Sequence, residues 1–290
     1  EFPHLTGLKG RTLLTSDGTT ILGADDKAGI AEILTMIERI QTENRPHGMI
    51  CVAFTPDEEI GMGAEHFNLD QFGAEYAYTL DGDSEGEIQY ENFNACKAEF
   101  EIRGFNVHPG EGKDTMINAS LVAIEINNCL PSMETPRGTE DYEGFYHLIS
   151  MQGEVGEAKL NYIVRDHDKN GFEERKKTLR LIEKNLNAKW GEGTVTLKIT
   201  DQYLNMKEIV EEHMHLIDHA KKACEAAGVA PLILPIRGGT DGCQLSFKGL
   251  PCPNLGTGGH AFHGPYEHIS VEGMEKSVEL LLALIQEYTK

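Results

Sequence analysis

Basic residues are scarce in this sequence. Its 290 residues include 26 Lys and Arg against 47 Asp and Glu, which gives a formal net charge of −21. Nucleic acids and anionic membranes attract proteins through basic patches. We therefore expect neither a nucleic-acid partner nor a membrane partner.

Long apolar runs and paired cysteines are missing as well. No apolar run approaches the length of a membrane span. None of the six cysteines forms a CxxC pair, and most have the apolar neighbours typical of small buried side chains. We expect a globular protein of the reducing cytoplasm, although a sequence that opens with Glu1 rather than Met leaves a targeting segment open.

Short apolar runs alternate with helical segments in the first part of the chain. Residues 11–22 predict two short strands around a turn, and 26–43 predict a helix with one apolar face. The runs 49–55 and 77–80 predict two further strands. This alternation, which resumes after residue 206 with a helix over 207–227, predicts an α/β fold with a mostly parallel sheet flanked by helices.

The pattern between these two parts is different. From residue 98 to 200 it reads strand, helix, strand, strand, helix, strand, which is the split βαβ arrangement of a ferredoxin-like α+β domain. We therefore predict a catalytic domain built from 1–93 and 206–290, with an inserted lid domain over 94–205.

Acidic residues gather where the predicted strands of the first domain end. Asp25, the pair Glu58-Glu59 and Asp81 each follow a short apolar run, and a further run leads to His263. Ligands of open α/β sheets bind beyond the carboxyl ends of the strands. Carboxylates and an imidazole delivered there suit a divalent metal, most simply zinc, and carboxylates can bridge two ions.

Each of these signals also has an ordinary explanation. Asp25 can cap the helix that follows, Glu58-Glu59 can be a solvated loop, and Asp81-Gly82 can be a turn. However, a second aspartate at Asp26 is not needed for capping. In the glutamate pair, adjacent side chains of extended backbone point in opposite directions. One glutamate of the pair can therefore bind a metal while its neighbour acts as a general base.

The combined segments resemble the peptidase T family, which are tripeptide aminopeptidases among the co-catalytic zinc exopeptidases. The resemblance runs over nearly the whole chain, and ADDKAG together with RGGTDG is its most specific part. The matching segments are LGADDKAGIAEI (22–33), AFTPDEEIGMGAEHF (53–67), AYTLDGDSEGEIQYENFNA (77–95), NVHPG (106–110), YEGFYHL (142–148), PIRGGTDGCQLSF (235–247), GLPCPNLGTGG (249–259) and HGPYEH (263–268).

The resemblance implies a metal centre with two zinc ions. Asp25 is implied as the carboxylate that bridges them, Asp81 as a ligand of one ion, and Glu59 and His263 as ligands of the other. Glu58 is implied as the general base that deprotonates the bridging water.

The resemblance also implies substrate contacts. His108, in the inserted domain, is implied to stabilise the oxyanion of the tetrahedral intermediate. Arg237 is implied to bind the C-terminal carboxylate of a small peptide, with Asn118 and Arg165 as further candidates for that contact.

One family segment has no counterpart. The family carries a His-x-Asp segment that supplies a further zinc ligand, and no His here is followed two residues later by Asp. We therefore expect one zinc site to be short of a ligand, and a chain that lacks the family's N-terminal portion.

Three alternatives stay open beside the tripeptide aminopeptidase. The first is a zinc carboxypeptidase or N-acyl amino acid deacylase of the same broad family. The second is a truncated core that binds metal or peptide without turnover. The third is an α/β protein whose acidic loops are only caps and turns, and the sequence leaves a homodimer open in every case.

Overall fold

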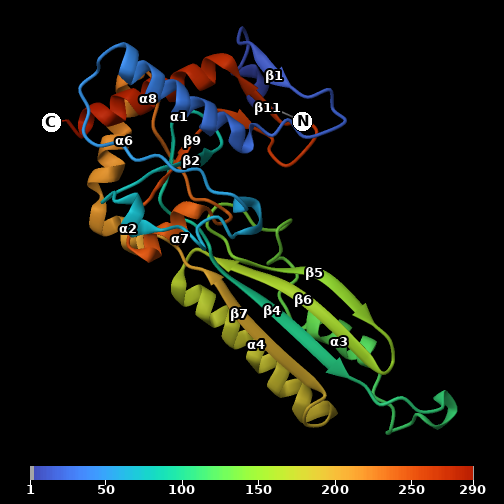
Figure 1. Ribbon diagram of the computed structural model, residues 1–290. Helices are drawn as coiled ribbons and strands as arrows, with labels where there is room; N and C mark the ends of the chain where they lie inside the picture. The colour runs from blue at the N-terminus through green and yellow to red at the C-terminus, as the bar shows by residue number, and fades with distance from the viewer. Residues whose placement is uncertain (1–2, 290) are drawn as a thin grey trace. The chain divides into compact units, whose positions relative to one another are not determined.

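The computed structural model describes residues 3–289 and divides into two compact units (Figure 1). Unit 1 combines Glu1–Glu91 with Met206–Lys290, and unit 2 is Asn92–Asn205. Unit 2 is therefore an insertion in the chain of unit 1. None of the helices within the described residues is both long and apolar enough to cross a membrane.

Two small sheets organise unit 1. The first has the order β2-β9-β3-β8, in which β2–β9 and β3–β8 are parallel and β3–β9 is antiparallel. Its strands are β2 (Thr79–Gly82), β3 (Glu87–Gln89), β8 (Leu232–Ile233) and β9 (Asn254–Gly256). The second is antiparallel in the order β1-β11-β10, with strands β1 (Leu13–Thr15), β10 (Gly259–His260) and β11 (His268–Ser270).

Three longer helices pack together in unit 1. The C-terminal helix α8 contacts both α1 and α6 (Figure 1). Their bounds are α1 Ala24–Thr42, α6 His215–Ala226 and α8 Val271–Glu287. The shorter elements are η1 (Pro3–Thr6), η2 (Glu58–Ile60), α2 (Leu69–Phe72), α5 (Lys207–Val210), η4 (Glu211–His213) and α7 (Asp241–Lys248).

The buried face of α1 differs from the one its apolar residues predict. Of the predicted apolar face, Ile40 is buried, but Ile30 and Leu34 are 39% and 52% exposed. Glu32 and Met36, which lie outside that face, are buried instead. The helix contacts α8, β2 and β10 with the face that carries these buried residues. One consequence is a glutamate in the interior, because Glu32 is only 1% exposed.

Two predicted strands do not form. Residues 49–55 have strand-like composition but no strand pairs with them in the described chain, so Met49 and Phe54 stay 83% and 50% exposed. Beyond the turn at Asp17, side-chain bonds replace strand pairing: Asp17 accepts from the Thr19 N–H at 2.9 Å. The Ser16 hydroxyl likewise donates to the Thr20 carbonyl at 2.7 Å.

The predicted helix over 207–227 is divided into α5, η4 and α6. The two α-helical parts have different packing partners, since α5 contacts α7 whereas α6 contacts α8. The backbone stays in the right-handed helical region through the 3₁₀ segment, as the dihedral angles of Val210, Glu211 and Met214 show.

Unit 2 has the split βαβ arrangement. Its antiparallel sheet has the order β5-β6-β4-β7, and helices α3 and α4 contact it. Fully buried side chains between sheet and helices include Phe100, Tyr162 and Phe172. The elements are β4 (Asn94–Arg103), η3 (Pro109–Glu111), α3 (Ala119–Asn128), β5 (Phe145–Gly153), β6 (Glu157–Asp166), α4 (Lys169–Trp190) and β7 (Val195–Tyr203).

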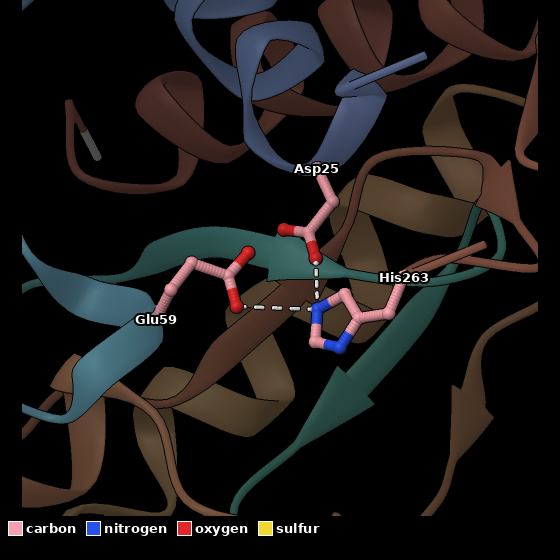
Figure 2. A group of neighbouring side chains, drawn as sticks. All are labelled: Asp25, Glu59 and His263. Atoms are coloured by element: carbon pink, nitrogen blue, oxygen red, sulfur yellow. Dashed lines mark hydrogen bonds and ion pairs between the residues drawn. The ribbon is translucent and has the colours of Figure 1, made fainter. Parts of the chain in front are cut away.

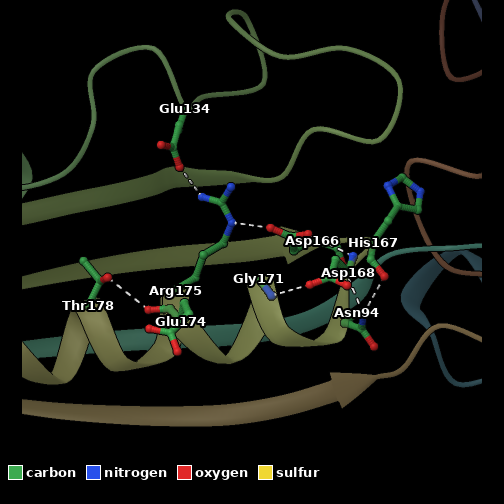
Figure 3. Close-up of polar contacts among 9 residues, drawn as sticks. All are labelled: Asn94, Glu134, Asp166, His167, Asp168, Gly171, Glu174, Arg175 and Thr178. Atoms are coloured by element: carbon green, nitrogen blue, oxygen red, sulfur yellow. Dashed lines mark hydrogen bonds and ion pairs between the residues drawn. The ribbon is translucent and has the colours of Figure 1, made fainter.

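A charged network closes one end of this unit (Figure 3). Arg175 of α4 lies between two carboxylates: its Nε donates to Asp166 at 2.7 Å, and its Nη1 donates to Glu134. Asp168 caps the same helix by accepting from the Gly171 N–H at 2.6 Å. Asp166 and Glu134 therefore each have the Arg175 guanidinium as a partner, and Asp168 has a backbone N–H group.

Three buried asparagines join the two points where the chain enters and leaves unit 2. The Asn92 N–H donates to the Asn205 side-chain oxygen at 3.1 Å, and the Asn205 N–H donates to the Asn94 side-chain oxygen at 3.0 Å. The two ends of the insertion are therefore hydrogen-bonded to each other.

Candidate metal centre

Three loops of unit 1 deliver carboxylates and an imidazole to one place. Asp25 lies at the start of α1, after Gly23, whose φ of 71° is in the left-handed region that favours glycine. Glu59 lies in η2, and His263 lies in the loop between β10 and β11. His263 itself has a φ of 61°, a strained conformation for a non-glycine residue that is typical of functional sites.

These three side chains point toward one another (Figure 2). The His263 Nε2 atom lies 2.9 Å from Asp25 Oδ2 and 3.3 Å from Glu59 Oε2. One donor atom from each of the three residues lies within 4.8 Å of the others. An arrangement of two carboxylates and one imidazole is a common ligand set for zinc and related divalent ions.

Further carboxylates surround this group and repel one another. Burial, and then the charges of Asp26, Glu58 and Asp25, raise the pKa of Asp81 to about 9, and a hydrogen bond with Asp25 adds to this. Burial, opposed by a bond from the Gly29 N–H and aided by Asp25, raises the pKa of Asp26 to about 8. So many carboxylates in one place oppose their own ionisation.

Glu58 belongs to the same electrostatic environment. Burial raises its pKa to about 7, followed by the charges of Asp241, Glu59 and Asp25. The pKa of this half-exposed side chain therefore lies near neutral pH, which is the range suited to a general base or acid.

A divalent cation fits these residues. Three donor atoms already converge, and the raised pKa values of the neighbouring carboxyl groups mark a site where negative charge is under-compensated. A bound cation would favour the ionised form of each of these carboxyl groups.

The sequence prediction missed a carboxylate that holds two of the loops. Glu267 is 1% exposed and accepts two backbone bonds, from Gly23 N at 2.6 Å and from Asp25 N at 3.0 Å. It follows His263 by four residues, so it connects the histidine loop to the start of α1. Its place within the segment HGPYEH was the only signal in the sequence.

The remaining candidate residues lie elsewhere. Arg237 is half-buried in the loop between β8 and α7 of unit 1. His108 and Asn118 lie in unit 2, where each caps a helix: His108 Nδ1 accepts from Gly110 N at 3.2 Å, and Asn118 accepts from Leu121 N at 3.3 Å.

Arg165, also in unit 2, is 9% exposed. Its guanidinium donates to the carbonyls of Val164 and Cys96 at 3.1 and 3.4 Å, and it lies over the Tyr203 ring. The guanidinium is therefore engaged within its own sheet.

Comparison with known proteins identifies the family. The model of peptidase family M20/M25/M40 matches residues 18–287, which include all the converging side chains. The chain belongs to this peptidase family. This result confirms the resemblance found in the sequence.

Named relatives within this family include a peptidase T from Clostridium perfringens. It is 56% identical over 289 residues, which cover 99% of this chain and 71% of the relative. The crystal structure of aminopeptidase PepT from Bacillus cereus matches with a TM-score of 0.84 and 28% identity, over 96% of this chain and 74% of that one.

A more distant structure shares the fold. The Bacillus subtilis protein described as a dinuclear metal-binding peptidase of the M20 family matches with a TM-score of 0.66 and 15% identity, over 90% of this chain and 71% of that one. Together these structures confirm the predicted fold class, an α/β domain with an inserted α+β domain.

Proposed function

We propose that this chain is a metal-dependent aminopeptidase that removes the N-terminal residue from tripeptides. The convergence of Asp25, Glu59 and His263 is the observation that carries the proposal. The likeness to peptidase T, at 56% identity over almost the full chain, indicates the substrate class.

The residues proposed to hold metal are Asp25, Glu59, Asp81 and His263. Asp25 contacts His263 and shares a hydrogen bond with Asp81, so it stands between the two other donor groups and is suited to bridge two ions. The mixture of imidazole nitrogen and carboxylate oxygen favours zinc. When bound, such an ion supplies Lewis-acid polarisation of the scissile carbonyl and lowers the pKa of water.

Glu58 is proposed to move the proton. Its carboxylate would accept a proton from the attacking water and then donate it to the leaving amine, which requires a pKa near the working pH. The environment of Glu58 provides this, because burial and neighbouring carboxylates raise its pKa to about 7.

The two ends of the peptide substrate carry opposite charges and need protein groups of opposite charge to bind them. The acidic centre suits the free α-amino group of the substrate, and Arg237 is proposed to bind the C-terminal carboxylate through its planar guanidinium. His108 is proposed as a donor to the oxyanion. The six free cysteines agree with a reducing compartment, so we propose that the protein is cytoplasmic.

The test combines metal content with turnover on one sample. Zinc should bind the chain, and Leu-Gly-Gly should be hydrolysed faster than N-acyl amino acids. Preference for the acylated compounds would favour a deacylase, and metal binding without any turnover would favour a binding core.

Two neighbouring substitutions separate the assigned roles. Glu58→Gln should lower kcat by about 10²- to 10⁴-fold, the usual contribution of a general base, and leave zinc stoichiometry unchanged. Glu59→Gln, the matched control one residue away, should lower zinc affinity. Substantial turnover by Glu58→Gln would exclude the role of Glu58 as the base.

A further inference from the structure

One face of helix α7 holds the loop that carries Glu58 and Glu59. Asp241, Gln244 and Lys248 occupy positions i, i+3 and i+7 of the helix region, so they lie on the same side. Each of the three side chains bonds to a different point between residues 55 and 65.

The bond from Asp241 lies closest to the glutamates. The Thr55 hydroxyl donates to Asp241 Oδ2 at 2.6 Å, and Asp241 is only 4% exposed. A hydrogen bond to a buried carboxylate is among the stronger kinds of hydrogen bond in proteins. Thr55 precedes Glu58 by three residues, so it fixes the entry to the glutamate loop.

Gly63 shows how closely the two segments approach. A Cβ atom at Gly63 would overlap both carboxylate oxygens of Asp241, so only glycine allows the contact. Gly63 lies at the end of the glutamate loop and Thr55 at its start, so both ends of the loop contact the Asp241 carboxylate.

Two more side chains continue the attachment. Gln244 Nε2 donates to the Gly61 carbonyl at 3.0 Å. Lys248 Nζ donates to the Ala64 carbonyl, and to the Glu65 carbonyl at 2.8 Å. Backbone carbonyls on both sides of Gly63 are therefore bound to α7.

Little regular structure constrains this loop otherwise. Residues 47–57 form neither helix nor strand, and η2 is a single 3₁₀ turn in which the Glu59 side chain is 59% exposed. The position of an exposed ligand depends on the groups that hold its backbone. Apart from the Glu59–His263 ion pair at 3.3 Å, the side-chain hydrogen bonds that the structure shows for residues 55–65 are those with α7.

We propose that α7 is a positioning element, in which Asp241 acts through Thr55 to set where Glu59 stands relative to Asp25 and His263. This inference rests on the proposed metal centre, to which it adds the residues that hold one of its ligands in place. Asp241 is not one of the three converging donor residues and acts through Thr55, so it is proposed as a positioning residue rather than a catalytic one.

The first experiment measures the loop without any metal. Hydrogen exchange of the metal-free full chain should show faster exchange of amides 56–65 in Thr55→Val, while the rest of unit 1 exchanges as before. Thr55→Ser retains the hydroxyl and should restore protection. Thr42→Val is the matched control, because Thr42 donates to Glu38 on an exposed part of α1.

The second experiment is a zinc titration of the same proteins by calorimetry. Thr55→Val should weaken zinc binding by about 10- to 100-fold, the usual effect of removing a group that orients a ligand. Thr55→Ser and Thr42→Val should bind as the unchanged chain does. In a double-mutant cycle, Thr55→Val and Asp241→Ala should be strongly non-additive, because both remove the same bond.

The outcomes separate this inference from the proposed function. Unchanged exchange at 56–65 in Thr55→Val, or additive effects in the cycle, would overturn the positioning role even if zinc binds normally. Failure of the unchanged chain to bind zinc would overturn the metal centre itself, and the positioning role with it. If Thr55→Val and Thr42→Val lowered zinc affinity equally, the cause would be general destabilisation, and the positioning role would be overturned.

Discussion

Carboxylates in the two units of this chain have opposite surroundings. In unit 2, Asp166 and Glu134 flank Arg175, and each carboxylate is paired with its guanidinium (Figure 3). In unit 1, Asp25 and Glu59 converge on His263 (Figure 2). The carboxyl group of Asp81 interacts with Asp25 as well.

The two arrangements have different consequences for the same functional group. Burial alone would lower the pKa of Arg175, but its bonds to Asp166 and Glu134 raise it overall, so the charged form is favoured there. In unit 1 burial and neighbouring charges raise the pKa of Asp81 to about 9. A paired network leaves no buried carboxylate without a cation, whereas an unpaired cluster carries negative charge that a bound cation would compensate.

The largest effect should follow from unbalancing the network of unit 2. Arg175→Met leaves Asp166 largely buried without its cation, and we expect a loss of about 3 kcal/mol in unfolding free energy. Urea unfolding of the full chain, followed by a signal from unit 2, measures it. A loss below 0.5 kcal/mol, the range of exposed pairs, would mean that the two regions do not differ as described.

The next effect should come from removing one charge of the cluster in unit 1. Asp25→Asn should weaken zinc binding by at least about 100-fold, yet it should not lower the thermal stability of the metal-free protein, because it relieves repulsion. Zinc titration and thermal unfolding in chelator measure the two quantities. Asp70→Asn, at an exposed position of α2, is the control.

Glu32 offers a buried carboxyl group outside the donor cluster. Burial, and then the charge of Asp26, raise the pKa of Glu32 to about 10, and neither of its oxygens has a hydrogen-bond partner in the described chain. Its pKa is higher in the folded than in the unfolded protein, so unfolding releases a proton between about pH 4.5 and pH 10, and stability falls as pH rises through that range.

Glu32→Gln should therefore reduce this pH dependence. We expect the variant to gain about 2 kcal/mol relative to the unchanged chain between about pH 5 and pH 6.5, since each pH unit contributes at most about 1.4 kcal/mol. Thermal unfolding at the two pH values measures it. Parallel pH profiles for the two proteins would show that Glu32 is ionised in the fold.

The smallest effect should come from an exposed pair in unit 2. Lys177 and Glu174 are 65% and 69% exposed, and their contact should contribute less than about 0.5 kcal/mol. Lys177→Ala thus provides the baseline for Arg175→Met on the same helix. A loss of several kcal/mol in Lys177→Ala would mean that the exposed ion pair contributes as much as the buried ion pairs of Arg175.

The sequence predicted those features that depend on local pattern. The ferredoxin-like order of unit 2 follows from strand alternation and helical spacing, and its antiparallel sheet and two helices form in that order. The positions at strand ends predicted a metal cluster, and the family resemblance implied Asp25, Glu59 and His263 as ligands within it. The structure brings the donor atoms of these three residues together. Their role as metal ligands stays a proposal.

Features set by distant partners could not be predicted in this way. Residues 49–55 have the composition of a strand, but a strand also needs a neighbour with which to pair. The apolar stripe of α1 suggested one buried face, whereas contacts with α8 and β2 bury the face of Glu32 and Met36. Glu267 and Asp241 act through bonds to residues far away in sequence, which no local pattern reveals.

The asparagines at the ends of unit 2 have a consequence for how such a protein can be assembled from parts. Asn92 and Asn205 are hydrogen-bonded, so a short peptide could join the two ends and little chain entropy would be lost in closing it. A segment with adjoining ends can be excised, permuted or grafted into a surface turn of another protein without stretching either one. In genetic terms, unit 2 is a cassette whose two boundaries lie at the same point of the fold.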